Sequence, residues 1–265
     1  MKFSLIKMDE IDEALCRRWQ DIRLTSSIYG SPYYHPEYAK IAARAKQNAW
    51  LLICEDGGQV SGLLPFHLRG SFRAEVIGGV LSDYQGPINL PNFEWPIREM
   101  LRAMKVCHFG FNHMPTERKE FERFSWGHSR SQIINLTGGF ESYSKNLLET
   151  RDASLLKKIN TSLRKLSNKY GEVQFAMQSL SDVDFQTLKK GKSEQFIRTA
   201  GHSSDIFSVP WISQMLDEIR FSSFPDFRGM LSTLKVDGVL LAAHFGMRSD
   251  CVLHYWFPWY CHDFS

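Results

Sequence analysis

Apolar and polar residues alternate in two well-separated series of short strands. Each series has three predicted strands: residues 50–55, 60–68 and 72–79 in the first, and residues 228–235, 239–247 and 251–257 in the second. An Asp-Gly step, Asp56-Gly57 or Asp237-Gly238, separates the first two strands of each series. Such a step is typical of a tight hairpin, because both central residues of the turn need a positive φ. The pattern therefore predicts two antiparallel three-stranded meanders.

Apolar residues at helical spacing precede each meander. They predict helices at residues 11–24 and 36–46 before the first meander, and at residues 180–199 and 210–221 before the second. The order strand, helix, helix, meander thus occurs twice. We expect an α+β fold of two similar domains in tandem, 1–138 and 139–265, with mixed, mostly antiparallel sheets. The alternative, a chance similarity between two hairpins, stays open at this point.

The last predicted strand leads into the most aromatic part of the chain. Trp256, Phe257, Trp259 and Tyr260 fall within its last ten positions, although terminal segments are normally polar. We expect the element that covers these rings to be missing from this polypeptide or supplied by another chain, so that the second domain is incomplete. An uncovered edge strand invites pairing, and we expect a homodimer through this C-terminal strand.

Composition narrows the class of protein. The chain has 265 residues, of which 43% are hydrophobic and 13% aromatic, enough for one large or two modest cores. It has no apolar run of membrane length and no secretion signal, so we expect no membrane span. Its five cysteines form no CxxC motif, which favours the cytoplasm and argues against a metal site or disulfides. A net charge of +3 is too weak to indicate a DNA-binding protein.

The positive charge is concentrated in residues 151–169. Six basic residues there face a single acid, Asp152, and leucines and Ile159 recur at helical spacing. We predict an amphipathic basic helix that begins at Asp152 or Ser154 and ends at Gly171. Such a helix could face a phosphate-bearing ligand or RNA, but the same pattern is typical of a solvated face over an ordinary apolar stripe.

Two polar clusters are candidates for chemistry, since HExxH, GxSxG, Walker and GxGxxG motifs are all absent. One is Ser82-Asp83-Tyr84-Gln85-Gly86, which directly follows the first meander and could equally be a plain turn. The other is the row Lys192, Gln195 and Arg198, which a helix places roughly on one side. A row of donors suits an anionic or hydroxyl-rich ligand, although surface solvation explains it as well.

The last strand also carries polar side chains. On a regular strand His254 and Trp256 point to one face, and Tyr255 and Phe257 point to the other. Single histidines inside apolar runs, such as His67, are more typical of satisfied core residues than of catalysts.

Together, these segments resemble one family. The segment 82–86, the segment KSEQFIRTAG at 192–201, Arg228-Gly229 and Leu253-His254-Tyr255-Trp256 followed by Tyr260 occur in the same order in the CelD/BcsL acetyltransferases of bacterial cellulose and exopolysaccharide production. That family is part of the GNAT acyltransferase superfamily, in the tandem form also seen in FemAB-like peptidyltransferases. The resemblance covers nearly the whole chain and agrees with the internal repeat.

The resemblance implies transfer of an acyl group from acyl-CoA, such as acetyl-CoA, to a small-molecule or saccharide acceptor. A backbone N–H of the meander would polarise the thioester carbonyl, and a general base would deprotonate the acceptor. It implies His254 and Tyr260 as base and acid, with His244 as a weaker candidate. The acceptor cleft between the domains would be lined by Asp83, Tyr84, Lys192, Gln195 and Arg198.

The chain departs from the family at the cofactor site. GNAT proteins hold the CoA pyrophosphate at the N-terminus of a helix after the meander, whereas this sequence ends where the second such helix should begin. Residues 86–94, before a predicted helix at 95–105, lack the usual CoA-loop pattern. We therefore expect this chain to bind acyl-CoA poorly. A FemAB-like aminoacyl transferase and a non-catalytic binding or regulatory protein of the same fold remain alternatives.

Overall fold

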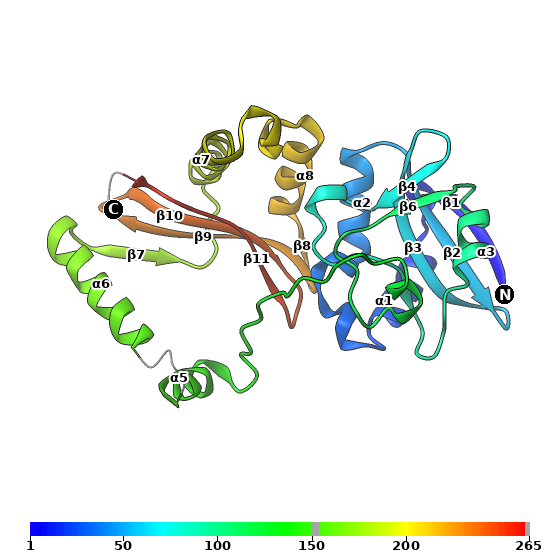
Figure 1. Cartoon of the computed structure of the whole chain (residues 1–265). Helices are drawn as coiled ribbons and strands as arrows, with labels where there is room; N and C mark the ends of the chain where they lie inside the picture. Colours follow the sequence, from blue (N-terminus) through cyan, green and yellow to red (C-terminus); the bar gives the residue numbers. More distant parts are fainter. Residues whose placement is uncertain (150–153, 263–265) are drawn as a thin grey trace.

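The computed structural model describes residues 1–149 and 154–262. It has two sheets, one in each half of the chain (Figure 1). The first sheet has the order β1-β2-β3-β4-β6, with β5 paired to β3. Its pairs are antiparallel except β4 with β6, which is parallel. The elements of this half are β1 (Lys2–Lys7), α1 (Glu13–Arg23), α2 (Pro36–Ala45), β2 (Ala49–Asp56), β3 (Gln59–Arg69), β4 (Arg73–Val76), β5 (Ile88–Asn89), α3 (Ile97–Ala103), β6 (His108–Gly110) and α4 (Lys119–Glu122).

The second sheet has the order β11-β10-β9-β7, with β8 paired to β9, and all its pairs are antiparallel. The elements of this half are α5 (Gly139–Glu149), α6 (Leu155–Tyr170), β7 (Val173–Ala176), α7 (Asp182–Ala200), α8 (Pro210–Phe221), β8 (Ser223–Phe224), β9 (Phe227–Val236), β10 (Val239–Arg248) and β11 (Leu253–Tyr260). Both halves therefore contain a strand, two helices and a meander, with the first strand paired to the first meander strand. The predicted α+β fold with mixed, mostly antiparallel sheets is confirmed.

Local sequence signals set the helix ends near their predicted positions. Asp12 caps α1 by accepting the N–H of Leu15 at 2.7 Å, and Ser181 caps α7 by accepting the N–H of Asp184 at 3.2 Å. Proline occupies the first position of both α2 and α8, where its missing N–H has no helical partner to lose. These helices need little tertiary help to begin where they do.

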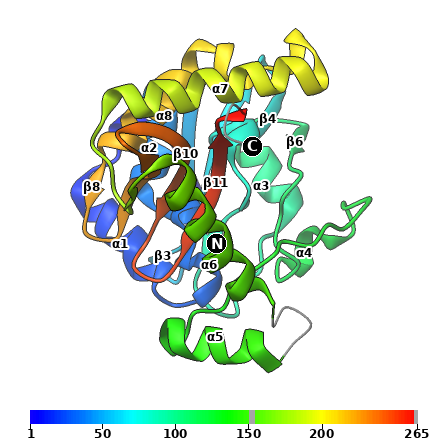
Figure 2. The same ribbon diagram turned by 90° about the vertical axis from the view of Figure 1, so that its left-hand side faces the viewer.

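The predicted basic helix is α6, and Gly171 at φ 106° ends it as expected. Ser154 occupies the cap position without a side-chain hydrogen bond, while Arg151 and Asp152 lie outside the described residues. Neither α5 nor α6 has a buried side chain, and α5 lies apart from both sheets (Figures 1 and 2). No helix in the described part of the chain combines the length and hydrophobicity needed to cross a bilayer.

Two meander strands differ from the prediction. β4 ends at Val76 rather than at Gly79, because Gly78 and Gly79 adopt φ 74° and 53° and turn the chain into a 3₁₀ turn at Gly79–Leu81. β11 runs from Leu253 to Tyr260, so the aromatic residues expected after the last strand belong to it. The strand therefore begins two residues later and ends three residues later than predicted.

A β-bulge changes the predicted facing of Phe257 in the last strand, whereas His254 and Trp256, predicted to share a face, both lie against the Tyr33 ring. Phe245 and Met247 lie two positions apart on β10, but their partners Phe257 and His254 lie three positions apart on β11, where regular pairing would place them two apart. His254 and Phe257 consequently share one face, whereas alternation predicts opposite faces. The extra residue leaves Tyr255 67% exposed, while Phe257 joins the core.

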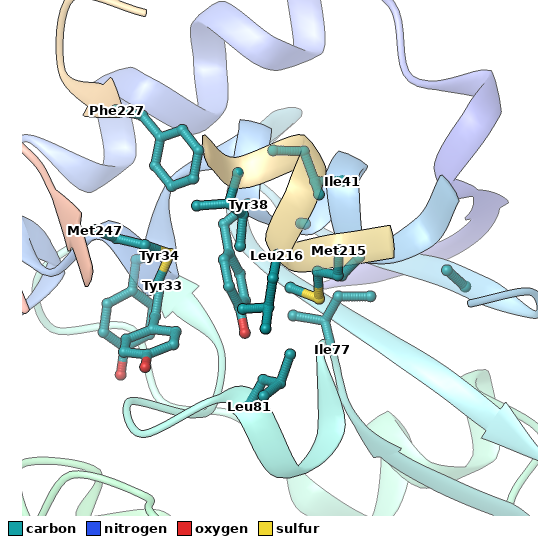
Figure 3. Close-up of a cluster of buried hydrophobic side chains, with 14 of the residues drawn as sticks. Tyr33, Tyr34, Tyr38, Ile41, Ile77, Leu81, Met215, Leu216, Phe227 and Met247 are labelled. Carbon is teal, nitrogen blue, oxygen red and sulfur yellow. The ribbon is translucent and has the colours of Figure 1, made fainter. Parts of the chain in front are cut away.

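The two halves share a hydrophobic core. Helix α2 contacts α8, and both lie between the sheets (Figure 1). Figure 3 shows the centre of this contact, where Tyr38 and Ile41 of α2 lie beside Met215 and Leu216 of α8. A second core lies on the other face of the first sheet, against α3, and contains residues such as Phe66. Each buried Leu or Phe stabilises the fold by roughly 1.5–3 kcal/mol, so the shared core ties the halves together.

Candidate functional site

The junction of the two halves brings a histidine and a carboxylate together. His254 Nε2, on β11, lies 3.0 Å from Asp83 Oδ2, which follows the 3₁₀ turn after β4. The His254 side chain is 16% exposed and that of Asp83 is 40% exposed, so the pair lies at the edge of the core within reach of solvent. His254 forms no other side-chain hydrogen bond within the described residues, which leaves Nδ1 available. Two of the sequence-predicted site residues, 171 positions apart, therefore meet.

Aromatic rings surround this pair. The Tyr33 ring stands edge-on to the His254 ring at 4.8 Å, and the Tyr33 hydroxyl lies 3.5 Å from Asp83 Oδ2. The rings of Trp256 and Tyr84 each lie near both the His254 ring and the Tyr33 ring, with centroids 6.0–6.4 Å apart. Burial first, and the charges of neighbouring groups second, raise the pKa of Tyr33 well above its ordinary value. Tyr33 therefore stays protonated and donates to the carboxylate.

Hydrogen bonds of two buried side chains, Ser82 and Gln85, hold the loop that carries Asp83. Ser82 Oγ donates to the carbonyl of Ile77 at 2.5 Å and contacts the Tyr38 hydroxyl at 2.7 Å. Gln85 is 2% exposed, and its Oε1 accepts the N–H groups of Asn112 and His113 at 2.8 and 3.0 Å. Ser82 and Gln85 thus anchor the loop, while the Asp83 side chain contacts His254 on β11. The segment is more than a plain turn.

His244, the weaker candidate base, is already engaged. Its Nε2 accepts the N–H of Trp256 at 3.0 Å at the bulge, and its ring stacks on Tyr255 at 4.2 Å. Burial, with a smaller effect of His254, lowers the pKa of His244 to about 4. A neutral imidazole whose Nε2 lone pair is occupied is a poor proton acceptor, so the geometry favours His254.

The donor row on α7 faces a different set of neighbours. Lys192 is only 9% exposed, and its Nζ donates to Gln195 Oε1 at 2.8 Å. Arg198 Nη2 lies 3.3 Å from His262 Nε2. We expected this row to line one cleft with Asp83, but neither Lys192 nor Arg198 forms an ion pair with Asp83 within the described residues, where Asp83 pairs with His254.

Lys192 nevertheless has an unusual environment for a cation. It forms no ion pair within the described part of the chain, and its Nζ lies 5.5 Å from the Phe196 ring centroid. Desolvation lowers the pKa of Lys192. The next residue back, Gly191, lies so close to Trp259 that a Cβ there would clash with the indole. The row therefore packs near β11, on the strand that carries His254.

Tyr260 lies far from the pair along the same strand. It lies six positions after His254, or about 20 Å at the rise of an extended strand. Its side chain is 59% exposed and its ring lies 4.9 Å from the His262 ring. The two residues do not form one acid–base pair, and a separate role of Tyr260 stays a prediction.

Sequence reasoning missed Tyr33. Its signal was the run Ser31-Pro32-Tyr33-Tyr34-His35 between the first two helices, in which polar aromatics are concentrated too strongly for an ordinary connection. The structure buries all these side chains and uses Pro32 to start a 3₁₀ turn. No group of three or more metal-binding side chains occurs within the described residues.

Comparison with known proteins bears on the second half of the chain. Residues 153–265 match the family model of the acetyltransferase (GNAT) domain. The match contains β11 with His254 and α7 with Lys192, covers less than half of the chain, and excludes Asp83. It supports the acetyltransferase part of the resemblance for this segment.

A search of solved structures found a tandem GNAT protein from the clavulanic acid biosynthesis pathway, in a structure without AcCoA. It is 12% identical, and the alignment covers 94% of this chain and 74% of that one, with a TM-score of 0.37. A TM-score this low does not by itself show a common fold. No curated protein matches the chain.

Proposed function

We propose that this protein is an acyl-CoA-dependent acyltransferase whose reaction centre contains the pair His254 and Asp83. The contact at 3.0 Å between the two side chains carries the proposal, and the match of residues 153–265 to the acetyltransferase (GNAT) domain supports the reaction class. Such a pair suits a general base, because the carboxylate fixes the imidazole tautomer and stabilises the imidazolium that forms.

The proposed step starts with the acceptor. His254 donates Nε2–H to Asp83, so its Nδ1 lone pair takes the proton of an acceptor hydroxyl or amine. The acceptor oxygen or nitrogen then attacks the thioester carbonyl, and the bond to sulfur breaks. The CoA thiolate leaves and takes up a proton. Tyr33, held protonated, donates to Asp83 and keeps that carboxylate oriented.

The proposal also covers the acceptor, the cellular location and the affinity for acetyl-CoA. The resemblance to CelD/BcsL proteins supports a saccharide acceptor in cellulose or exopolysaccharide production. Lys192, Gln195 and Arg198 supply donors that suit hydroxyl-rich or anionic groups. Cys16, Cys54, Cys107 and Cys251 are free thiols, which supports a reducing, cytoplasmic location. The expectation that this chain binds acetyl-CoA poorly stays a prediction, and calorimetric titration checks it.

The test measures CoA release from acetyl-CoA at millimolar concentration, with glucosamine as an amine acceptor and cellobiose as a hydroxyl acceptor. We expect acceptor-dependent release, and a loss of kcat of about 10²–10⁴-fold in His254→Gln. Asp83→Asn should lower kcat and shift the pH–rate profile, with little change in KM for acetyl-CoA, because it disturbs only the imidazole tautomer. His202→Gln, at an exposed position, is the matched control.

Equal activity of His254→Gln and the parent chain would refute the assignment of the base. Absence of acceptor-dependent release with every acceptor, in a chain that binds acetyl-CoA, would favour a non-catalytic binding protein over an acyltransferase.

A further inference from the structure

A half-open cavity of about 790 Å³ lies in the first half of the chain. Residues of α3, β6 and the irregular segment 111–129 line it. Its walls are rich in apolar and aromatic side chains, among them Met100, Leu101, Phe109, Phe111 and Phe121. None of its lining residues belongs to the cluster around His254. The volume and lining are typical of a small-molecule site.

One wall of this cavity contains a buried cation. Arg118 is 8% exposed and lines the cavity. Its Nη1 donates to Asn89 Oδ1 at 2.7 Å, and its Nη2 donates to the Tyr29 hydroxyl. Both acceptors are neutral, and no carboxylate lies within ion-pair distance of Arg118 in the described part of the chain. A buried charge without a counter-ion is costly, so this guanidinium is an unusual wall residue.

The hydrogen bonds of this cation are also incomplete. A guanidinium has five N–H groups, and Arg118 uses two of them, while its Nε is buried without an acceptor. Asn89 Oδ1 cannot supply more, because it also accepts from Trp95 Nε1 at 3.1 Å. Desolvation lowers the pKa of Arg118, and the charge of Glu120 only partly opposes this effect. The site therefore has spare donors and a positive charge that forms no ion pair within the described residues, although the Tyr29 ring lies 4.9 Å from the guanidinium carbon.

We propose that this cavity binds an amphipathic carboxylate, whose head accepts hydrogen bonds from Arg118 and whose aliphatic or aryl tail fills the apolar space. Two parallel N–H groups of one guanidinium match the two oxygens of a carboxylate. The one carboxylate among the lining residues, Glu122, is exposed and pairs with Lys119 at 3.8 Å. Glu120, whose charge acts on Arg118, does not line the cavity and forms no ion pair with the guanidinium within the described residues.

Calorimetry and saturation-transfer NMR with octanoate test this site. Octanoate should bind saturably, and 1-octanol, with the same tail and no charge, should bind at least tenfold more weakly. Leu101→Trp should fill the apolar space and weaken octanoate binding by tenfold or more without touching Arg118. Val183→Trp, which places the same ring at a 74% exposed position on α7, should bind octanoate like the parent chain.

A second variant addresses the charge directly. Arg118→Gln should lose the preference for octanoate over 1-octanol, and where this variant fails to fold, Leu101→Trp decides. Equal affinity for octanoate and 1-octanol in the parent chain would overturn the proposal, as would unchanged octanoate binding in Leu101→Trp. Displacement of octanoate by acetyl-CoA would also overturn it, because the cavity would then belong to a cofactor site. None of these outcomes depends on acyltransferase activity.

Discussion

His35 and Asp226 illustrate how single residues respond to the junction between the sheets. His35 Nδ1 accepts the N–H of Glu37 at 3.0 Å, so Nε2 carries the proton and faces Asp226 Oδ1 at 2.7 Å. Arg23 Nη1 donates to the other carboxylate oxygen at 2.6 Å. Burial lowers the pKa of His35 to about 4, despite the opposing charge of Asp226. The structure thus keeps His35 neutral while Asp226 stays ionised.

This arrangement predicts a loss of stability on acidification. Burial lowers the pKa values of His35, His67 and His244 to about 4, below the ordinary value of about 6.5. Between pH 6.5 and pH 4 the unfolded chain binds protons that the folded chain does not, so the free energy of unfolding decreases as the pH is lowered. For His35, whose side chain is 3% exposed, the loss is on the order of 3 kcal/mol.

Urea unfolding at several pH values between 7 and 4 measures this effect. His35→Gln keeps a donor for Asp226 but cannot titrate, so its stability should fall less steeply, by about 1.4 kcal/mol per pH unit below pH 6. His202→Gln, which replaces an exposed histidine, is the control. Parallel curves for the parent chain and His35→Gln would contradict the prediction. The lowered pKa of Asp226, where hydrogen bonds and charges from Arg23 and His35 outweigh burial, adds a further loss only below pH 4.

At the scale of elements, β11 carries the proposed base His254 and also has an exposed edge. It is the outermost strand of the second sheet, and no strand of the described residues pairs with its outer side. Leu253 and Tyr255 are 50% and 67% exposed. Pro258 has no N–H, which limits any further strand pairing mainly to residues 253–257. The edge therefore has a short segment free to pair.

We predict a homodimer formed through this segment of β11. Leu253→Lys should shift the chain towards monomer, because an edge lysine opposes strand pairing and its charge would be buried at a symmetric contact. Val239→Lys is the matched control, since Val239 is 51% exposed on β10, away from the edge. Sedimentation equilibrium at tens of micromolar protein measures the difference. A parent chain that is monomeric under these conditions would rule out the dimer.

At the scale of the whole molecule, the two halves are joined more tightly than tandem domains need to be. One core contains side chains of α1 and α2 together with side chains of α7, α8, β9 and β10. Arg44 of α2 also pairs with Glu218 of α8 at 2.8 Å. The boundary between 138 and 139 therefore describes a repeat in the chain, and the shared core predicts that the halves unfold together.

Hydrogen exchange in increasing urea tests this coupling. Leu216→Ala, in the shared core, should cost about 2–5 kcal/mol and lower the protection of β2–β3 and β9–β10 by equal amounts. Leu180→Ala, at an 85% exposed position, should change neither sheet. If Leu216→Ala lowered the protection of β9–β10 alone, the halves would be independent domains.

The sequence by itself determined the two meanders and the helices that precede them, but not the shorter elements β5, β6, β8 and α4. Alternation, Asp-Gly turns and helix caps act over a few residues. Most ends of the meander strands, of α2 and of α8 therefore lie within one or two residues of their predicted positions. His254 and Asp83 were each recognisable as candidates, because polar residues next to apolar strands are chemically conspicuous. The repeat followed from the same local signals, since each half repeats its strand and helix pattern.

Only the tertiary structure decided which candidates meet. The contact between His254 and Asp83 joins residues 171 positions apart, and no local pattern encodes such a distance. The bulge in β11 depends on the register against β10, so alternation alone placed Phe257 on the wrong face. Tyr33 and Arg118 became notable only once burial and neighbours were known, because an exposed Tyr or Arg in the same sequence would be ordinary. Interactions between residues close in sequence select the strands and helices. The packing of α2 against α8 decides which residues of the two halves come close together.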